Sequence, residues 1–296
     1  LPVGNGRLGA MVYGGRRVER LALDESTFWS GEATPEADVR GDPQLLAAIR
    51  RELAGGDLAR AHALAQGITG RKGNYGTHLR LGNLWLVFDH PLEGLAQYRR
   101  ELDLDAAVVC STYTWDGANY SRAVFASHVD QVLVVHLACS RPGGLGVRLW
   151  LDGDEQPCEV RRTGADTLEL HCLARETTHS DGQTGVTGHV RLQVLPEDGV
   201  LTSLGSQIRL AGATAVTIIV AAGTTWAGSD PQAACAAQVA AAAAQPYAAL
   251  LAAHQADYRS LYRRSLLALG PAPHPSWPVD RRLAAVRAGE ADPHLC

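Results

Sequence analysis

Residues 119–139, NYSRAVFASHVDQVLVVHLAC, contain two runs of strand-forming residues on either side of a short polar turn. Runs of this kind, separated by Gly, Pro, Asp or Asn, recur from Leu81 to Trp226. Besides the two above they are NLWLVFD, YRRELDLD, AAVVCSTYTW, GVRLWLD, TLELHCLA, HVRLQVLP and AVTIIVAAGT. Many short runs with a turn signal roughly every ten residues are typical of a sandwich or barrel and not of alternating βαβ units. Two more runs lie near the N-terminus, RLGAMVYG and RVERLALDES. The sequence therefore predicts a mainly β fold, a large antiparallel β super-sandwich of roughly twelve strands.

Helical signals lie both within and after the strand region. We expect short helices at about 43–66, where Asp42 precedes a proline and provides an N-cap. After the strands, Asp230 and a proline open an alanine-rich helix, which Pro246 restarts. The final run, VDRRLAAVRAGEADPHLC, has the pattern of a further helical element. The chain is thus expected to contain a β super-sandwich at 1–228, a helical linker at 229–270 and the start of a helical domain at 271–296.

The composition excludes some partners. The chain has 296 residues, a net charge of −4 and 20% charged residues, which favours neither nucleic acid nor a membrane surface. No apolar run approaches the roughly 18 residues that span a bilayer. The six cysteines show no C-x-x-C or Cys/His spacing, so we expect buried free thiols and no metal site. Because the sequence starts without Met, the localisation stays undetermined between the cytoplasm and secretion from a bacterium.

The glycines near the N-terminus match a cofactor motif by spacing alone. Gly4, Gly6 and Gly9 in GNGRLG follow the G-x-G-x-x-G pattern of a dinucleotide-binding turn. That turn needs a strand before it and a helix after it. Only three residues precede Gly4, and Gly14 and Gly15 would end a helix before two turns are complete. We interpret the glycines as turn residues at the start of a β-sheet and expect no cofactor.

Two polar segments in the strand region have structural and functional interpretations. DGDEQ at 152–156 groups carboxylates as a glycosidase dyad or a calcium loop would. A calcium loop needs further ligands and a distal glutamate at fixed spacing, which are missing. We therefore interpret the segment as a tight turn between strands. His128 and Asp130 flank Val129, and a structural hydrogen bond is expected there.

Five blocks of the sequence resemble, in order and spacing, the N-terminal region of glycoside hydrolase family 95: LPVGNGRLGAMVYGG, LDESTFWSG, LGNLWLVFD, YRRELDLDAAVV and NYSRAVFASHVDQVLVVHL. The best-known members are α-L-fucosidases that act on α-1,2-linked fucose, and some prefer L-galactose. The resemblance implies a β super-sandwich, a helical linker and an (α/α)6 catalytic barrel, of which 271–296 would be an incomplete first part. It also implies an inverting mechanism whose acid and water-activating residues come from the barrel. No catalytic residue is therefore expected in this chain.

Four residues on expected loops are candidates for contact with a substrate. Glu25 and Trp29 lie in LDESTFWSG, and Tyr75 and Arg80 lie in NYGTHLRLG. A flat aromatic face packs on the C–H face of a pyranose, and charged groups bind its hydroxyls. The alternative for each residue is a structural position at a strand end.

Two functions of different classes stay open. The first is the non-catalytic N-terminal portion of an inverting α-L-fucosidase, or of a parent enzyme that prefers an α-L-galactoside. Its partners would be a fucosylated oligosaccharide and its own (α/α)6 domain. The second is a stand-alone carbohydrate-binding or scaffold module. The run AAVRAGEADPHLC would leave apolar residues unburied in a finished module, which favours the first function.

Overall fold

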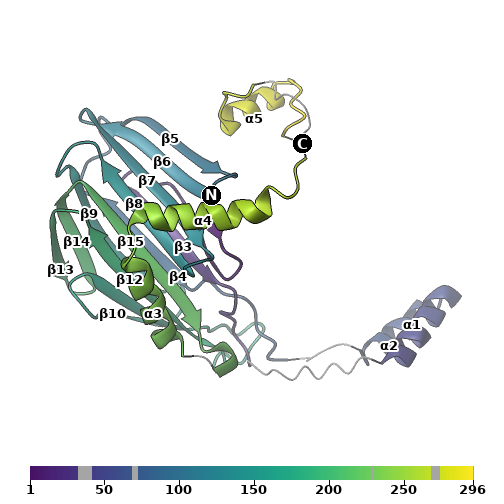
Figure 1. The fold of residues 1–296 in the computed structure, drawn as a ribbon. Coiled ribbons are helices and arrows are strands. Elements are labelled where there is room, and N and C mark those ends of the chain that lie inside the picture. The colour runs from purple at the N-terminus through teal and green to yellow at the C-terminus, as the bar shows by residue number, and fades with distance from the viewer. Residues whose placement is uncertain (33–41, 69–72, 229, 268–273, 296) are drawn as a thin grey trace. The chain divides into compact units, whose positions relative to one another are not determined.

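The computed structural model describes residues 1–32, 42–68, 73–228, 230–267 and 274–295. Its contacts divide the chain into two units, Leu1–Tyr258 and Arg259–Cys296. Within the described residues, the first unit contains 15 strands in two sheets (Figure 1). All neighbouring strands for which a register is defined pair antiparallel. The predicted mainly β, antiparallel fold is confirmed.

One sheet has seven strands, and its spatial order combines the N-terminal hairpins with strands from later in the chain. In order across the sheet these are β1 (Pro2–Gly4), β2 (Leu8–Val12), β3 (Val18–Glu25), β4 (Gly82–Phe88), β9 (Leu145–Asp152), β14 (Gln207–Ala213) and β13 (Val200–Leu204).

The other sheet has eight strands, with β15 at its centre. In order these are β10 (Cys158–Arg162), β11 (Thr167–Leu173), β12 (Thr187–Pro196), β15 (Ala215–Thr224), β8 (Val132–Cys139), β7 (Ala118–Ser127), β6 (Val108–Trp115) and β5 (Ala96–Asp103).

The glycine motif forms a β-hairpin. Gly4 on β1 pairs with Gly9 on β2, and the turn between them places Gly6 at φ +90°, a left-handed conformation that favours glycine. The side-chain oxygen of Asn5 accepts hydrogen bonds from the backbone N–H groups of Arg7 (3.0 Å) and Leu8 (2.8 Å). The interpretation of these glycines as turn residues is therefore confirmed.

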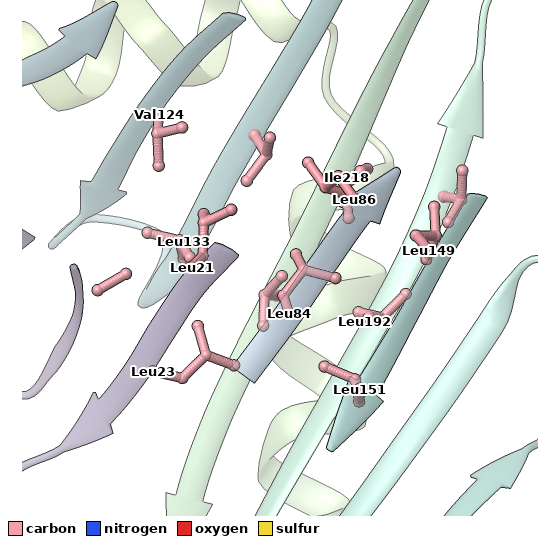
Figure 2. Close-up of a cluster of buried hydrophobic side chains, with 14 of the residues drawn as sticks. Leu21, Leu23, Leu84, Leu86, Val124, Leu133, Leu149, Leu151, Leu192 and Ile218 are labelled. Atoms are coloured by element: carbon pink, nitrogen blue, oxygen red, sulfur yellow. The ribbon is translucent and has the colours of Figure 1, made fainter. Parts of the chain in front are cut away.

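The main core lies between the two sheets. Figure 2 shows leucines of β3 and β4 in one cluster with side chains from the eight-stranded sheet. Leu21, Leu84, Leu133, Leu192 and Ile218 each have 0% exposure. Fully burying one such side chain stabilises the fold by roughly 1.5–3 kcal/mol, so this cluster dominates the stability of the sandwich.

Two helices form a further layer on the outer face of the eight-stranded sheet. They are α3 (Pro231–Ala243) and α4 (Tyr247–Tyr262), and they follow the short 3-10 helix η1 (Trp226–Gly228). Val239 and Leu250 of these helices belong to one buried cluster with Phe125 and Ile219 of the sheet. His254 on α4 also contacts the backbone oxygen of Ala106, 3.0 Å from its Nε2. Strands β8 and β15 are therefore covered on both faces.

The remaining helices match the expected positions. In α1 (Pro43–Gly55) and α2 (Leu58–Ala65), Asp42 and Asp57 provide the N-caps. In the second unit, α5 (Val279–Arg287) has no buried residue. Among the described residues no single helix has the length and apolar character to cross a membrane; α3 and α4 reach that limit only when combined, across a 109° bend.

The structure also differs from the sequence-based expectations. Strands β1, β10, β13 and β14 were not predicted as separate runs. Cys139, Cys172 and Cys235 are buried free thiols as expected, but Cys110 is only half-buried and Cys158 is exposed, so the prediction is wrong for these two. Cys296 lies outside the described residues. Cys158 is exposed because it lies on β10, an edge strand whose residues are all at least partly exposed.

Candidate functional site

Three loop segments meet at the end of the sandwich where β3 ends and β4 begins. We call residues 26–32, 73–81 and 174–186 the loop cluster. The first two segments form a bridge between Trp29 and His78, and the backbone N–H of Ser30 donates to the oxygen of Thr77 (3.0 Å). A Cβ on Gly76, at φ +69°, would lie 1.6 Å from the oxygen of Ser30, so this approach requires glycine.

The third segment is bound to the other two by hydrogen bonds. Ser30 Oγ donates to Glu176 Oε1 (2.8 Å), and the N–H of Gly76 donates to the oxygen of His179 (3.0 Å). Burial acts to raise the pKa of Glu176, but hydrogen bonds from His179 N, Ser30 Oγ and Thr178 N outweigh it and lower the pKa. Glu176 is therefore an ionised carboxylate that fixes the loop cluster.

The loop cluster brings two of the candidate residues to the surface. The side chains of Trp29 and Tyr75 are 43% and 56% exposed. The Trp29 ring meets His78 edge-on at 5.9 Å, and the Tyr75 ring lies 5.8 Å from that of His179. The indole N–H of Trp29 is used in a bond to Ser26 O (3.1 Å), which leaves its aromatic surface for contact. Exposed aromatic rings beside imidazoles can stack on a sugar and bind its hydroxyls.

Glu25 lies at the base of the loop cluster and is only 2% exposed. Its carboxylate accepts hydrogen bonds from Thr27 N (2.8 Å) and Thr27 Oγ1 (2.6 Å), and Arg7 Nη1 lies 3.4 Å away. Thr27 Oγ1 in turn contacts Thr224 Oγ1 at the end of β15 (2.5 Å). In this structure Glu25 connects the loop to both sheets, and its carboxylate does not point into solvent.

Arg80 lies on the outer face of the seven-stranded sheet beside the turn that follows β9. Its Nη1 donates to Asp154 Oδ2 (2.8 Å), and Arg20 Nη2 donates to Oδ1 of the same carboxylate (3.2 Å). Asp152 accepts from Trp85 Nε1 (2.6 Å) and Asn83 Nδ2 (2.7 Å). The DGDEQ segment is a turn in which Asp154 adopts φ +55°, so the structural interpretation of this segment is confirmed.

The candidates thus occupy three environments: Trp29 and Tyr75 are exposed, Glu25 is buried beneath them, and Arg80 is paired with a carboxylate. The sequence reasoning missed the partners that complete the cluster, His78, Glu176 and His179. His78 lies within the quoted segment NYGTHLRLG, but no spacing signal marks the other two. Burial also raises the pKa of Asp24, which lies close to His78 and Arg80; their charges oppose this shift.

The turn between β7 and β8 contains the other residues singled out in the sequence. Asp130 accepts hydrogen bonds from Ser127 Oγ (2.7 Å) and from Gln245 Nε2 at the end of α3 (3.0 Å). His128 Nδ1 lies 3.6 Å from Asp257 Oδ2 on α4. Both residues therefore connect the turn to the covering helices, and the hydrogen bonds of Asp130 confirm the structural role expected there.

Comparison with known proteins identifies a family whose model matches this chain. The model of the family described as "Glycosyl hydrolase family 65, N-terminal domain" matches residues 1–229. "Alpha-L-fucosidase 2" of Arabidopsis thaliana is 28% identical over 298 residues, which cover 91% of this chain and 35% of that protein. "Probable alpha-fucosidase A" of Aspergillus niger is 31% identical over 143 residues, which cover 46% of this chain and 17% of that protein.

A solved chain described as a kojibiose phosphorylase from the human microbiome matches with a TM-score of 0.53 and 11% identity. The match covers 88% of this chain and 35% of that chain, and at this identity it shows the fold alone. The present chain spans about a third of the length of the plant relative and less of the fungal ones. The expected likeness to the N-terminal region of a glycoside hydrolase is confirmed, although the matching model has the number 65 where the motifs resembled family 95.

Proposed function

Because the chain belongs to the family of glycosyl hydrolase family 65 N-terminal domains, we propose that it is the non-catalytic N-terminal portion of an inverting α-L-fucosidase. The substrate of the whole enzyme would be a glycan with α-1,2-linked L-fucose. The observation that carries the proposal is the similarity to "Alpha-L-fucosidase 2", which covers 91% of this chain and so extends past residue 229, where the match to the family model ends.

The state of three carboxyl groups, those of Glu19, Glu25 and Asp154, supports a non-catalytic role. A glycosidase needs an accessible acid with a raised pKa and a second carboxylate or water-activating group across the sugar. Burial raises the pKa of Glu19, but this residue is 2% exposed and paired with Arg122 inside the sandwich (2.9 Å). Glu25 is buried, and Asp154 is bound by two arginines. These groups are stabilised as structural ion pairs.

The loop cluster gives this domain a surface for contact with the glycan. Trp29 and Tyr75 present aromatic surface on segments that hydrogen bonds fix in place. In the proposal, these rings contribute to one wall of the substrate cleft, while the catalytic groups come from the (α/α)6 domain. The domain would thus position a substrate that it does not cleave.

The second unit supports the (α/α)6 domain as a partner. Its α5 has apolar residues at Val279, Leu283 and Val286, which are 57%, 42% and 39% exposed. Exposed apolar side chains at helical spacing are typical of a helix that packs against another element. We propose that the other helices of the enzyme's own barrel cover this face.

The two alternatives make different predictions. A parent that prefers an α-L-galactoside would keep the same domain, because the selecting residues would lie in the barrel. A stand-alone carbohydrate-binding module would bind fucosylated glycan without cleavage in any form of the protein.

The test is release of L-fucose from an α-1,2-fucosylated oligosaccharide by the full product of the gene and, separately, by this chain. We expect release by the full product alone. Release by this chain would overturn the non-catalytic role. If neither releases fucose, an α-L-galactoside is assayed next, and failure there together with glycan binding would favour the module.

A variant pair tests the loop cluster in the full enzyme. Tyr75→Ala removes an exposed ring from the cluster, whereas Tyr13→Ala removes a 45% exposed ring from the outer face of the seven-stranded sheet. We expect a several-fold rise in KM for Tyr75→Ala and none for Tyr13→Ala, with the kinetics measured well below the Tm of each variant. Equal kinetics for both variants would contradict the assignment of substrate contact to the loop cluster.

A further inference from the structure

Strands β11 and β12 bring two histidines and a glutamate together on the outer face of the eight-stranded sheet. Glu169 and His171 are two residues apart on β11, so their side chains share a face. His189 on β12 lies directly opposite His171 in the ladder. One ligand atom from each of the three lies within 4.8 Å of the others. We call these three side chains the β11–β12 cluster.

The two imidazoles face each other as metal ligands do. His171 Nδ1 and His189 Nδ1 lie 3.3 Å apart. Two nitrogen ligands at 2.0–2.1 Å from a tetrahedral Zn²⁺ are separated by about 3.3 Å, so the observed spacing needs little adjustment. In the neutral pair only one of the two nitrogens bears the shared proton. Binding of a divalent cation would move that proton to Nε2 of the same ring, which makes both Nδ1 lone pairs available to the metal.

The rest of the protein makes little use of the His189 ring. The residue has 0% exposure, and its Nε2 is buried with no hydrogen-bond partner among the residues that the structure describes. Within the described part of the chain, the hydrogen-bond contact of its Nδ1 is with the neighbouring histidine. Because the great majority of buried polar atoms are paired, the sparse hydrogen bonding of this ring leaves Nδ1 free to exchange its contact with His171 for a metal.

Glu169 provides the negative charge. Its side chain is 3% exposed, and one of its oxygens, Oε1, contacts Arg191 Nη1. The side chain of Arg191 is 27% exposed, so it can move toward solvent when a cation approaches the carboxylate. In the absence of a metal, Arg191 neutralises a carboxylate that would otherwise be buried alone.

We propose that the β11–β12 cluster binds a divalent transition metal of the zinc type, through His171, His189 and the carboxylate of Glu169. Two imidazoles and one carboxylate favour Zn²⁺ or Co²⁺ over Mg²⁺ and Ca²⁺, which prefer oxygen ligands. Water completes the coordination. The proposal does not depend on the proposed fucosidase activity.

The bound metal would cross-link β11 to β12 beneath the start of α3. Cys235 of α3 lies over this part of β12, with its Sγ 3.9 Å from the backbone oxygen of His189. The role of the metal would therefore be structural: the metal would fix the two strands that support the first covering helix.

The test is titration of the EDTA-treated purified protein with Zn²⁺ by calorimetry, and with Co²⁺ by visible absorption. Cys158 is an exposed thiol opposite Cys172 in the β10–β11 ladder and would compete for Zn²⁺, so all proteins contain Cys158→Ser. We expect one equivalent of Zn²⁺ at micromolar affinity or tighter, the absorption of tetrahedral Co²⁺, and a rise in Tm of a few degrees.

Three variants test whether the metal binds at the β11–β12 cluster. His171→Ala changes a partly exposed ligand and should abolish binding, whereas His62→Ala, on α2, should leave it unchanged. Arg191→Gln removes the competitor for Glu169 and should increase the affinity several-fold. No binding by the parent protein, or unchanged binding by His171→Ala, would overturn the proposal. A lower affinity in Arg191→Gln would exclude Glu169 as a ligand.

Discussion

The two sheets of the sandwich have contrasting outer faces. The outer face of the eight-stranded sheet is apolar around Phe125, Val134 and Ile219, and α3 and α4 bury it. The outer face of the seven-stranded sheet has a row of polar and aromatic side chains, which we call the polar row. In the polar row the Arg20 guanidinium lies over the rings of Tyr13 (5.2 Å) and Trp85 (5.5 Å). We call these the helix-covered face and the open face.

The difference shows how the same kind of strand serves two environments. On β15 the run AVTIIVAA is buried at every position, because the core lies on one side and the helices lie on the other. On β9 the run LGVRLWLD alternates between buried and more exposed positions. The helix-covered face is therefore stabilised by burial, whereas the open face is stabilised by hydrogen bonds and stacking in partial contact with water. The two faces should respond differently to mutation, pH and salt.

The largest effect is expected on the helix-covered face. Ile219→Ala removes a side chain with 0% exposure between β15 and the covering helices. We expect it to lower the free energy of unfolding by about 2–5 kcal/mol, because it loses apolar burial and leaves a cavity. Urea denaturation followed by circular dichroism measures this change.

The matched control is Val87→Ala on β4. Val87 is only half-buried on the open face, so truncation should cost about 1 kcal/mol or less. If the two variants lose similar stability, the contrast in burial between the faces is wrong.

A smaller effect is expected from pH. Burial lowers the pKa of His136 under α4 and of His254 within it; the charge of Asp257 opposes the shift of His254 without reversing it. The folded state therefore binds fewer protons than the unfolded chain below a pH of about 6.5, the ordinary pKa of histidine. The stability that depends on these two neutral histidines should be fully present above that pH. It should be lost as the pH falls from about 6.5 through their lowered pKa values. Tm measured from pH 7.5 to pH 5 tests this sign.

The variant His254→Gln sharpens the pH test. Glutamine can still donate a hydrogen bond to Ala106 O but does not titrate, so the fall of Tm with acid should become shallower. An unchanged pH slope in this variant would exclude His254 as a source of the acid sensitivity.

On the open face, Arg20→Ala should cost about 1 kcal/mol of stability. The side chain donates to Asn83 (2.8 Å) and Asp154 (3.2 Å) and stacks on two rings, but it is 25% exposed, so water replaces part of what is lost. Arg20→Lys keeps the charge but lacks the planar guanidinium group, so most of the loss of stability should persist. Full recovery of stability in the lysine variant would show that charge alone stabilises the polar row.

The sequence predicted the helix-covered face better than the sheet edges. Continuous apolar runs such as AVTIIVAAGT mark central strands. Three of the four missed strands, β1, β10 and β13, lie at sheet edges. An edge strand has a partner on one side only and buries little: four of the five residues of β13 are exposed. Such strands lack the apolar pattern on which prediction from one sequence depends.

The candidate site was predictable only in part. Trp29 and Tyr75 could be selected for chemistry, but their shared location depends on Ser30 and Glu176, which are separated by 146 residues. The burial of Glu25 depends on Arg7 and on Thr224 from the other sheet, the latter through Thr27. Pairings between residues so distant in the chain leave no local signal in a single sequence.

The smallest effect is expected from the ion pair between Arg209 and Asp89 on the open face. Arg209 Nη2 lies 3.0 Å from Asp89 Oδ2, but the two side chains are 57% and 40% exposed. An exposed pair gains little because water screens its attraction and ordering two side chains costs entropy. A double-mutant cycle with Arg209→Ala and Asp89→Ala should give a coupling of about 0.5 kcal/mol or less, which falls further in 1 M NaCl because salt screens exposed charges. A coupling that is both large and insensitive to salt would mean that the open face is covered in solution, and the contrast between the two faces would then fail at this pair.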